Sequence, residues 1–181
     1  MSPRIIGLTG KKFAGKTTIS DYICVKYGFR EETFAGPLKK MLAIAFQTSE
    51  SIFHDPLTKE MVNSDLFGRT PRSLMQFLGT DVFRKCVHPD IWVENMRRRL
   101  SRASNVDADI IVTDIRFDNE AEVVRQMGGQ VWCIERGVGT ESHDVHESEN
   151  GIDSSLIDKH VRNLGTIDEL YMHVDRLMLG R

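Results

Sequence analysis

The sequence predicts an α/β fold in which a central, mostly parallel β-sheet is covered by helices on both faces. Short apolar runs, typical of buried strands, alternate with segments of helical periodicity along the whole chain. This alternation favours parallel strands, because each crossover connection carries a helix back over the sheet. The length of 181 residues, 40% of them hydrophobic, suits a single domain with one sizeable core.

In the first part of the chain, residues 4–9 form an apolar run that predicts a buried strand. A helix is expected over 16–28, where apolar positions recur before a closing glycine. Residues 29–34 predict a second strand. Residues 37–46 predict a helix that begins with proline at a first-turn position. Residues 47–68 are polar without a period, so we expect a mobile connection there.

The rest of the chain repeats the alternation of strands and helices. Thr70 and Pro71 are a cap and a first-turn proline, and they predict another helix start. The two glycines at 128–129 are expected to end a helix that begins at Asp118 or Asn119. The predicted helices are 70–79, 91–103, 118–129 and 166–179, and the predicted strands are 108–117, 130–136 and 159–165. We expect residues 137–157 to be a mobile, lid-like loop.

Composition narrows the class of protein. No run of eighteen apolar residues is present, and the first residues lack the basic and apolar regions of a signal peptide. We therefore expect a cytoplasmic protein without a membrane segment. The three cysteines, Cys24, Cys86 and Cys133, are scattered and form no CxxC pair. They are expected to be buried free thiols, rather than parts of a disulfide framework or a zinc site.

Charge is unevenly distributed along the chain. Residues 68–102 carry eight Lys and Arg against three Asp and Glu, a balance of +5, whereas the whole chain has a net charge of −2. A basic segment of this kind suits either nucleic acid or a pocket for a small polyanion. Because the repeated aromatic residues of a single-strand binder are missing, we favour the pocket and expect no stable nucleic-acid partner.

The most specific motif is GKKFAGKT, residues 10–17, which fits G-x-x-x-x-G-K-[ST] between a predicted strand and a predicted helix. Gly10 and Gly15 let the backbone turn tightly and aim N–H groups at phosphate oxygens. Lys16 can reach the β- and γ-phosphates, and the Thr17 hydroxyl can bind Mg²⁺. The nucleotide-binding residues are expected to be Gly10, Lys11, Lys12, Phe13, Ala14, Gly15, Lys16, Thr17 and Thr18.

Phosphoryl transfer to an acceptor that is itself a phosphate requires several further cations. Arginine suits this role because its planar guanidinium binds phosphate oxygens in pairs. Arg69, Arg116 and Arg136 each follow the end of a predicted element, where α/β sheets place ligands. Asp114 ends an apolar strand and is well placed to hold Mg²⁺ or its waters.

Three histidines, His143, His146 and His160, stand among acidic residues. The first two are three residues apart in a polar loop, and no thiolate is close in the sequence. We expect hydrogen bonding or a role in the lid rather than a metal site.

Several segments together resemble one family, the deoxynucleoside monophosphate kinases of bacteriophages, which are relatives of other P-loop nucleotide kinases. Besides the phosphate motif they are FAGPLK (34–39), RTPRSLMQFLGTDVFR (69–84), VTDIRFDNEAEVV (112–124), HESE (146–149) and NLGTIDEL (163–170). The segments occur in the family's order and span almost the whole chain. The chain departs from many relatives at Thr17, where they carry Asp, and at Gly36, where an acid is often found.

The resemblance implies a three-layer P-loop kinase fold over a single domain, residues 1–181, with lid-like insertions at 47–68 and 137–157. It also implies ATP as phosphoryl donor, Mg²⁺, a deoxynucleoside monophosphate as acceptor, and a homodimer in the host cytoplasm. The catalytic residues would be Lys16, Arg69, Asp114, Arg116 and Arg136, with Thr17 and Asp114 at the metal. The substrate-binding residues would be Phe34, Lys39, Arg69, Arg72, Gln76, Thr80, Asp81 and Arg116.

The leading hypothesis is that the chain phosphorylates deoxynucleoside 5′-monophosphates to diphosphates and so supplies nucleotides for DNA synthesis. One alternative is a P-loop kinase of another phosphorylated small molecule, such as dephospho-coenzyme A or phosphomevalonate. Another alternative is a nucleotide-binding NTPase that handles DNA through the basic segment.

Overall fold

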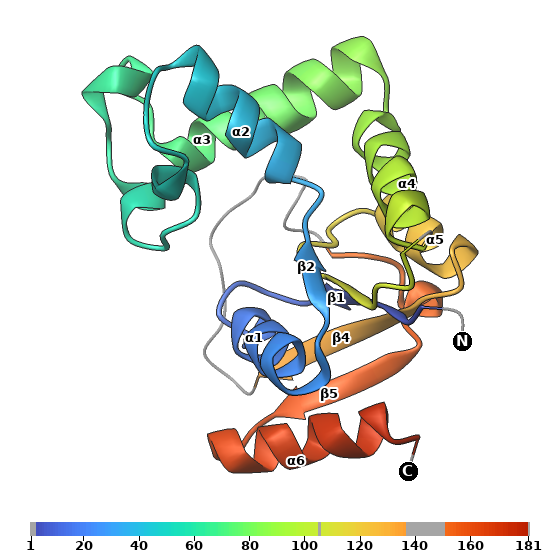
Figure 1. Cartoon of the computed structure of the whole chain (residues 1–181). Helices are drawn as coiled ribbons and strands as arrows, with labels where there is room; N and C mark the ends of the chain where they lie inside the picture. The colour runs from blue at the N-terminus through green and yellow to red at the C-terminus, as the bar shows by residue number, and fades with distance from the viewer. Residues whose placement is uncertain (1–2, 105, 137–150, 181) are drawn as a thin grey trace. The chain divides into compact units, whose positions relative to one another are not determined.

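The computed structural model describes residues 3–104, 106–136 and 151–180, which separate into two compact units (Figure 1). Unit 1 comprises residues 1–33 and 95–181, and unit 2 comprises residues 34–94. The expectation of a single domain over 1–181 stays a prediction.

Unit 1 contains a five-stranded sheet in which every pair of neighbouring strands is parallel, as the sequence predicts. All five residues of the first strand are buried, which explains its continuous apolar sequence. In spatial order the strands are β2 (Arg30–Glu32), β3 (Ile110–Val112), β1 (Ile5–Thr9), β4 (Gln130–Arg136) and β5 (Lys159–Asn163). The carboxyl ends of β3, β1 and β4 therefore lie next to one another.

Helices cover both faces of this sheet. On one face, Leu8 and Trp132 join a core cluster with Ile23 of α1 (Lys16–Tyr27) and Val174 of α6 (Ile167–Met178). On the other face lies α5 (Asp118–Gln126), which contacts β1 and β4. A Cβ atom on Gly7, which alternates with Leu8 along β1, would lie 3.3 Å from Val124 of α5. The three-layer arrangement is therefore confirmed.

Several predicted helix ends are confirmed in unit 1. Gly28 has a left-handed backbone with φ 73° and ends α1 by donating its N–H to the Cys24 carbonyl. Thr166 and Glu169 form a reciprocal capping box at the start of α6. A short 3₁₀ helix, η6 (Ser154–Leu156), precedes β5, and the Asp153 side chain caps it by accepting the Ser155 N–H.

Unit 2 is helical. Its elements are α2 (Gly36–Ala45), the 3₁₀ helices η1 (Glu50–Phe53), η2 (Thr58–Glu60) and η3 (Ser64–Leu66), α3 (Pro71–Gln76), the π-helix η4 (Phe77–Val87) and the first turn of α4 (Ile91–Ser104). Thr70 caps α3 by accepting the Ser73 N–H at 3.1 Å, as predicted. The segment 47–68 has no helical period, yet it is built of short turns that bury Phe53 and Leu66 completely. Its proposed mobility stays a prediction.

The π-helix η4 was not predicted, because its residues carry no period of their own in the sequence. Gly79 lies inside it, and a Cβ atom there would meet Leu38 of α2 at 2.8 Å. The Gly79 carbonyl accepts the indole N–H of Trp92 at 2.9 Å, and the Trp92 ring lies edge-on to Phe83. The π-helix is therefore packed at Gly79 against Leu38 of α2 and hydrogen-bonded there to the Trp92 indole.

Three expectations need correction. The strand predicted over 108–117 is short, because β3 ends at Val112 and the chain then leaves the ladder. Asp114 accordingly lies just beyond the strand rather than at its end. The cysteines are not all core thiols, since Cys86 is exposed and Cys24 and Cys133 are half-buried. Among the described helices, none is both long and apolar enough to cross a membrane.

Candidate active site

The phosphate loop, residues 10–17, connects β1 to α1 in unit 1 and requires glycine at two positions. Gly10 has φ 132° and Gly15 has φ 108°, both in a region that side chains disfavour. A Cβ atom on Gly10 would also collide with the carbonyl oxygen of Ile134 in β4, and one on Gly15 would lie 2.6 Å from the Asn163 amide. The loop is therefore packed against the ends of β4 and β5.

The carbonyl groups of the loop are held by side chains around it. The Lys16 ammonium donates to the Gly10 and Lys11 oxygens at 2.5 and 2.9 Å. Arg136, at the end of β4, donates to the Phe13 oxygen at 3.2 Å. Asn163, at the end of β5, donates to the Ala14 oxygen at 2.9 Å. When successive carbonyls are bonded in this way, the intervening amide N–H groups can face an anion.

The first turn of α1 adds a second feature that suits an anion. Its N-cap is Gly15, which offers no side chain to bond the free N–H groups, and no acidic residue lies in the first turn. The N–H groups and the positive end of the helix dipole therefore remain suited to a phosphate. Thr17 is exposed here, and Thr18 is half-buried beside it.

The turn that carries Asp114 and Arg116 is fixed against β1. The Ile115 N–H donates to the Leu8 carbonyl at 3.2 Å, and the Thr9 hydroxyl donates to the Ile115 carbonyl at 3.1 Å. The Glu120 carboxylate, only 3% exposed, accepts the N–H groups of Arg116 and Phe117 at 2.8 and 3.2 Å. Asp114 is thus held on the turn that follows β3, and β3 is the neighbour of the strand that leads into the phosphate loop.

The donor set in unit 1 fits a magnesium ion. The exposed hydroxyl of Thr17 and the half-buried carboxylate of Asp114 are oxygen ligands of the kind that Mg²⁺ prefers. These two residues would hold the ion next to the nucleotide phosphates.

Unit 2 holds all but one of the residues that the resemblance assigns to the acceptor, and the exception, Arg116, lies in unit 1. Lys39 is only 8% exposed, and its ammonium lies 3.4 Å from Nδ1 of His54. The Arg72 Nε donates to the Glu60 carboxylate at 2.7 Å, with the Arg72 side chain 18% exposed. The Arg69 guanidinium stacks 5.1 Å from the centre of the Phe77 ring.

The remaining acceptor candidates differ in exposure. Phe34 and Thr80 are buried, at 3% and 6%, and Gln76 is half-buried. Asp81 forms an ion pair at 2.9 Å with Lys85, four residues along the same helix. That ion pair gives Asp81 a local structural partner, while its role toward a substrate stays a prediction.

The structure brings together some of the predicted site residues and adds others. Lys16 and Arg136 meet on the carbonyls of the phosphate loop, and Asp114 and Arg116 share one braced turn. Asn163 and Glu120 were missed as site residues. Both stand in segments that carry the family resemblance, but their contacts depend on strand register and helix position. His143 and His146 lie outside the described residues.

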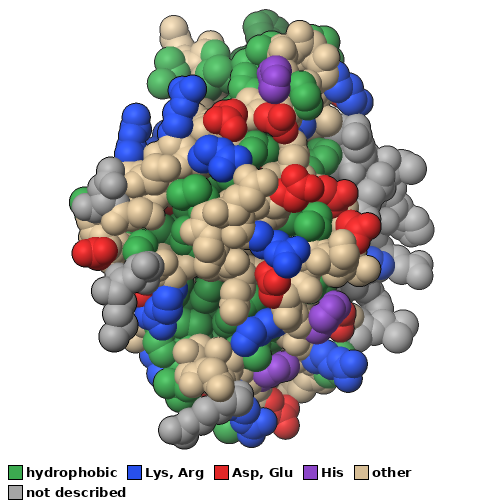
Figure 2. All heavy atoms as spheres, turned by 90° about the vertical axis from the view of Figure 1, so that its right-hand side faces the viewer, with side chains coloured by type: hydrophobic (Ala, Val, Ile, Leu, Met, Phe, Trp, Pro, Cys, Tyr) green, Lys and Arg blue, Asp and Glu red, His purple; other side chains and the backbone are tan. Residues whose placement is uncertain are grey.

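The basic segment 68–102 does not form one uniform surface. Arg72, Lys85 and Arg99 are paired with the acids Glu60, Asp81 and Glu32. On the face shown in Figure 2, acidic and basic side chains are interspersed. The preference for a small-anion pocket over a nucleic-acid surface stays a prediction.

Comparisons with known proteins place the chain in a family. A family model described as deoxynucleotide monophosphate kinase matches residues 56–174. The chain is 35% identical to a putative deoxynucleotide monophosphate kinase of Acanthamoeba polyphaga mimivirus, over 94% of this chain and 93% of that protein. It is 26% identical to the deoxynucleotide monophosphate kinase of Enterobacteria phage T4, over 94% of this chain and 97% of that protein.

A solved structure supports the fold independently. The dephospho-CoA kinase of Campylobacter jejuni matches with a TM-score of 0.54 at 13% identity, covering 97% of this chain and 96% of that chain. At this identity the likeness concerns the fold alone. The family model and the mimivirus protein carry the assignment: the chain belongs to the deoxynucleotide monophosphate kinase family.

Proposed function

We propose that this protein transfers the γ-phosphoryl group of ATP to deoxynucleoside 5′-monophosphates and releases ADP and the deoxynucleoside diphosphate. The observation that carries the proposal is the phosphate loop, whose carbonyls are bonded to Lys16, Arg136 and Asn163. Membership of the deoxynucleotide monophosphate kinase family supports the choice of acceptor.

The proposal assigns the nucleotide donor to unit 1. The loop amides and the start of α1 bind the phosphates of ATP, and Lys16 moves from the loop carbonyls to the β- and γ-phosphate oxygens. Thr17 and Asp114 would hold Mg²⁺, and the ion would supply positive charge that neutralises the β- and γ-phosphates. Arg116 and Arg136 add positive charge for the transferred group.

Unit 2 is assigned to the acceptor. The monophosphate binds to Arg69 and Arg72. On binding, Arg72 exchanges its contact with the Glu60 carboxylate for a contact with phosphate oxygens. Phe34 and Gln76 shape the monophosphate side of the site, with Thr80 and Asp81 close to them. Lys39 lies next to His54 and supplies a further charge at the monophosphate.

The phosphoryl transfer requires no covalent bond to the protein. An oxygen of the acceptor phosphate forms a bond to the γ-phosphorus, and the bond from that phosphorus to the β–γ bridging oxygen breaks. The electron pair leaves with ADP. Because the acceptor oxygen is already anionic, no general base is required, and positioning with charge neutralisation supplies the catalysis.

Further parts of the proposal rest on the resemblance. The segment 47–68 closes over the substrates and keeps water from the phosphoryl group, and most of the second segment expected to act as a lid, 137–157, lies outside the described residues. The protein acts as a homodimer in the cytoplasm and holds no stable nucleic acid.

A coupled assay of ADP release tests the function. The full chain is mixed with Mg·ATP and each of the common ribo- and deoxyribonucleoside monophosphates, with dephospho-coenzyme A and phosphomevalonate as rival acceptors. We expect turnover with one or more deoxynucleoside monophosphates. Turnover with a rival acceptor alone, or ATP hydrolysis that needs no acceptor and rises with DNA, would contradict the proposal.

A further inference from the structure

A cysteine, a glutamate and a histidine meet on the two strands at one edge of the unit 1 sheet. Cys133 of β4 lies directly opposite His160 of β5 in the parallel register. Glu135 is two residues beyond Cys133, so both side chains point to the same face of β4. Trp132 and Ile134 alternate with them and join the core cluster on the opposite face. Figure 1 shows β4 and β5 side by side.

The potential ligand atoms of these three side chains converge. The Cys133 sulfur, one Glu135 oxygen and one His160 ring nitrogen all lie within 4.8 Å of one another. His160 Nδ1 and Glu135 Oε1 are 2.7 Å apart. Cys133 is half-buried, and the other two side chains are 52% and 44% exposed, so an ion can reach them from solvent. The strand ladder fixes the backbone from which all three project.

We propose that Cys133, Glu135 and His160 form a site for a divalent transition-metal cation of the zinc class. Thiolate, imidazole and carboxylate are the three ligand types that Zn²⁺ accepts, at bond lengths of roughly 2.0–2.3 Å. Ligand atoms bound at such lengths lie within about 4 Å of one another, so small rotations of the side chains complete the site. Three protein ligands leave the fourth position of a tetrahedral ion for water.

This site differs from the proposed magnesium site in its chemistry. Thr17 and Asp114 offer oxygen alone, which suits Mg²⁺, whereas a thiolate ligand selects against Mg²⁺ and in favour of zinc-like ions. The sequence alone predicts hydrogen bonding or a lid role for His160 and a buried thiol for Cys133, because the two residues are far apart along the chain and belong to no spaced motif. Their meeting depends on the pairing of β4 with β5.

Two simpler readings explain less of the cluster. An exposed Glu135–His160 ion pair alone contributes little stability and does not involve the cysteine. A reactive thiol requires a lowered pKa, but burial raises the pKa of Cys133, and the Glu135 charge raises it further against the opposing effect of Lys16. The metal site uses all three side chains.

A metal ion bound at Cys133, Glu135 and His160 would affect the phosphate loop through β4 and β5. The metal would link β4 to β5 close to Arg136 and Asn163, the residues at the ends of those strands that hold the loop carbonyls. A ligand that binds the folded state alone raises its stability in proportion to the logarithm of its concentration. Bound metal should therefore raise the melting temperature of the protein.

Cobalt(II) provides the direct test, because a thiolate bound to Co²⁺ gives a charge-transfer band in the near ultraviolet. The reduced full-length protein is titrated with Co²⁺ without nucleotide. We expect the band to saturate at one equivalent, to disappear when Zn²⁺ is added, and to persist in excess Mg²⁺. A titration that gives no such band overturns the proposal.

Variants assign the band to this cluster. It should be lost in Cys133→Ser and kept in the matched controls Cys24→Ser and Cys86→Ser. Glu135→Gln and His160→Gln keep the thiol, so they should shift the Co²⁺ titration to at least about tenfold higher concentration. A band that survives in Cys133→Ser, or that is unaffected by both Glu135→Gln and His160→Gln, overturns the proposal.

Folding controls keep the result interpretable. Circular dichroism and thermal unfolding without metal establish that each variant is folded before it is titrated. Zn²⁺ should raise the melting temperature of the wild-type protein and of Cys86→Ser, and should have a smaller effect on Cys133→Ser. Because none of these measurements uses turnover, the outcome is independent of the kinase assay.

Discussion

The phosphate loop of unit 1 and the acceptor candidates of unit 2 are held by different kinds of contact. In unit 1, Lys16, Arg136 and Asn163 all bond to backbone carbonyls of the loop. In unit 2, Arg72 and Lys39 contact other side chains, Glu60 and His54. These contacts of the proposed donor site are therefore to backbone, while those of the proposed acceptor cations Arg72 and Lys39 are to side chains. We infer that phosphate binding is the fixed property and that acceptor choice is the adjustable one.

The largest effect is expected from Lys16→Ala, which removes the cation nearest the loop carbonyls. The loss of a group that stabilises developing phosphate charge should lower turnover by a factor on the order of a hundred or more. The measurement is steady-state ADP release at saturating substrates. Arg98→Ala, which removes an exposed cation from unit 1, is the matched control and should retain activity. Comparable activity in the two variants would show that the loop is not catalytic.

Arg72→Ala tests the acceptor side of the comparison. A charge-assisted hydrogen bond to phosphate is worth about 1.5–3 kcal/mol, so the KM for the monophosphate should rise by about ten- to a hundredfold. The KM for ATP should change little, since Arg72 belongs to unit 2.

The partner of Arg72 sharpens this test. Glu60→Gln removes the competing charge but keeps the arginine, so its monophosphate KM should stay within about fivefold of the wild-type value. Lys40→Ala removes an exposed cation from the same unit and controls for net charge. An increase in the KM for ATP in Arg72→Ala, with an unchanged monophosphate KM, would reverse the assignment of donor and acceptor.

Asn163→Ala should produce a smaller effect, confined to the donor. It removes one neutral hydrogen bond to the Ala14 carbonyl, worth about 0.5–1.5 kcal/mol, so the KM for ATP should rise by about two- to tenfold. Asn163→Asp keeps the shape but loses the donor, and should be at least as impaired. Leu164→Ala, at an exposed neighbouring position, should behave like wild type. If the alanine variant affects only stability, Asn163 does not shape the loop.

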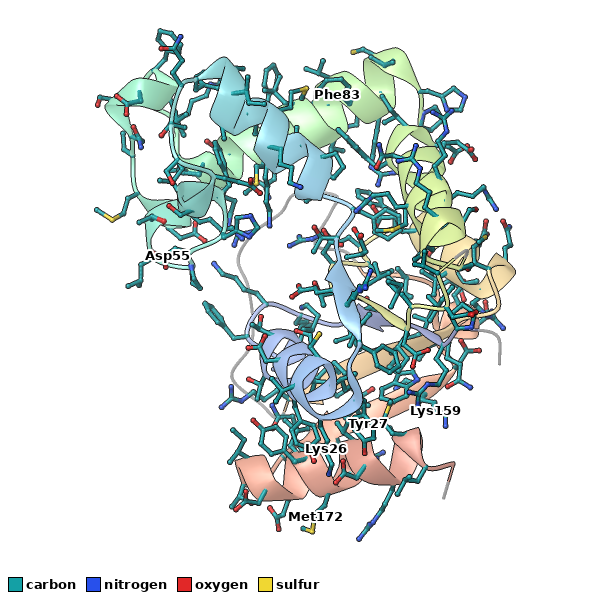
Figure 3. All side chains as sticks on the ribbon, in the orientation of Figure 1. Lys26, Tyr27, Asp55, Phe83, Lys159 and Met172 are labelled. Atoms are coloured by element: carbon teal, nitrogen blue, oxygen red, sulfur yellow. The ribbon has the colours of Figure 1, made fainter. Side chains whose placement is uncertain are left out.

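The smallest effect on activity is expected at the contact between α1 and α6. The Asp175 carboxylate of α6 accepts hydrogen bonds from Tyr22, Lys26 and Tyr27, at 2.7–2.8 Å, and Tyr22 stacks on Tyr171. Figure 3 shows Lys26 and Tyr27 between the two helices. Burial by itself raises the pKa of Asp175, but these hydrogen bonds outweigh it, so the pKa is lowered.

A lowered pKa in the folded state fixes the sign of the pH dependence. The ionised carboxylate stabilises the fold above its unfolded pKa, near 4, and this stabilisation is lost as pH falls through the lower folded value. Asp175→Asn should therefore lower the melting temperature at pH 7, and the difference from wild type should shrink below about pH 4. Thermal unfolding from pH 3 to 8 measures this. A gap that stays constant with pH would contradict the assignment.

The sequence was sufficient where local chemistry determines structure. The phosphate loop and α1 follow from the glycines at 10 and 15, and α3 begins at Thr70 because its hydroxyl caps the helix. The alternation of strands and helices predicted the parallel sheet. These features depend on neighbours in the sequence, so a pattern can reveal them.

Contacts between distant segments could not be read in this way. The pairing of Cys133 with His160 and the bond from Asn163 to Ala14 depend on the register of β5 against β4 and on its distance from the loop. The 3₁₀ turns of 47–68 form around buried Phe53 and Leu66, which stand in an otherwise polar stretch. Likewise, the π-helix packs closely against Leu38 at Gly79, a contact between distant residues that no period in its own sequence reveals.

The hydrogen bond between the Trp92 indole and Gly79 bears on how the protein can be studied by tryptophan fluorescence. The chain has two tryptophans, and they fall one in each unit, with Trp92 bonded to the Gly79 carbonyl in unit 2 and Trp132 buried in β4 of unit 1. Intrinsic fluorescence therefore carries a separate reporter for each half of the protein. Replacing either indole by phenylalanine leaves a single tryptophan, through which the response of one unit to an added nucleotide can be followed separately from that of the other unit.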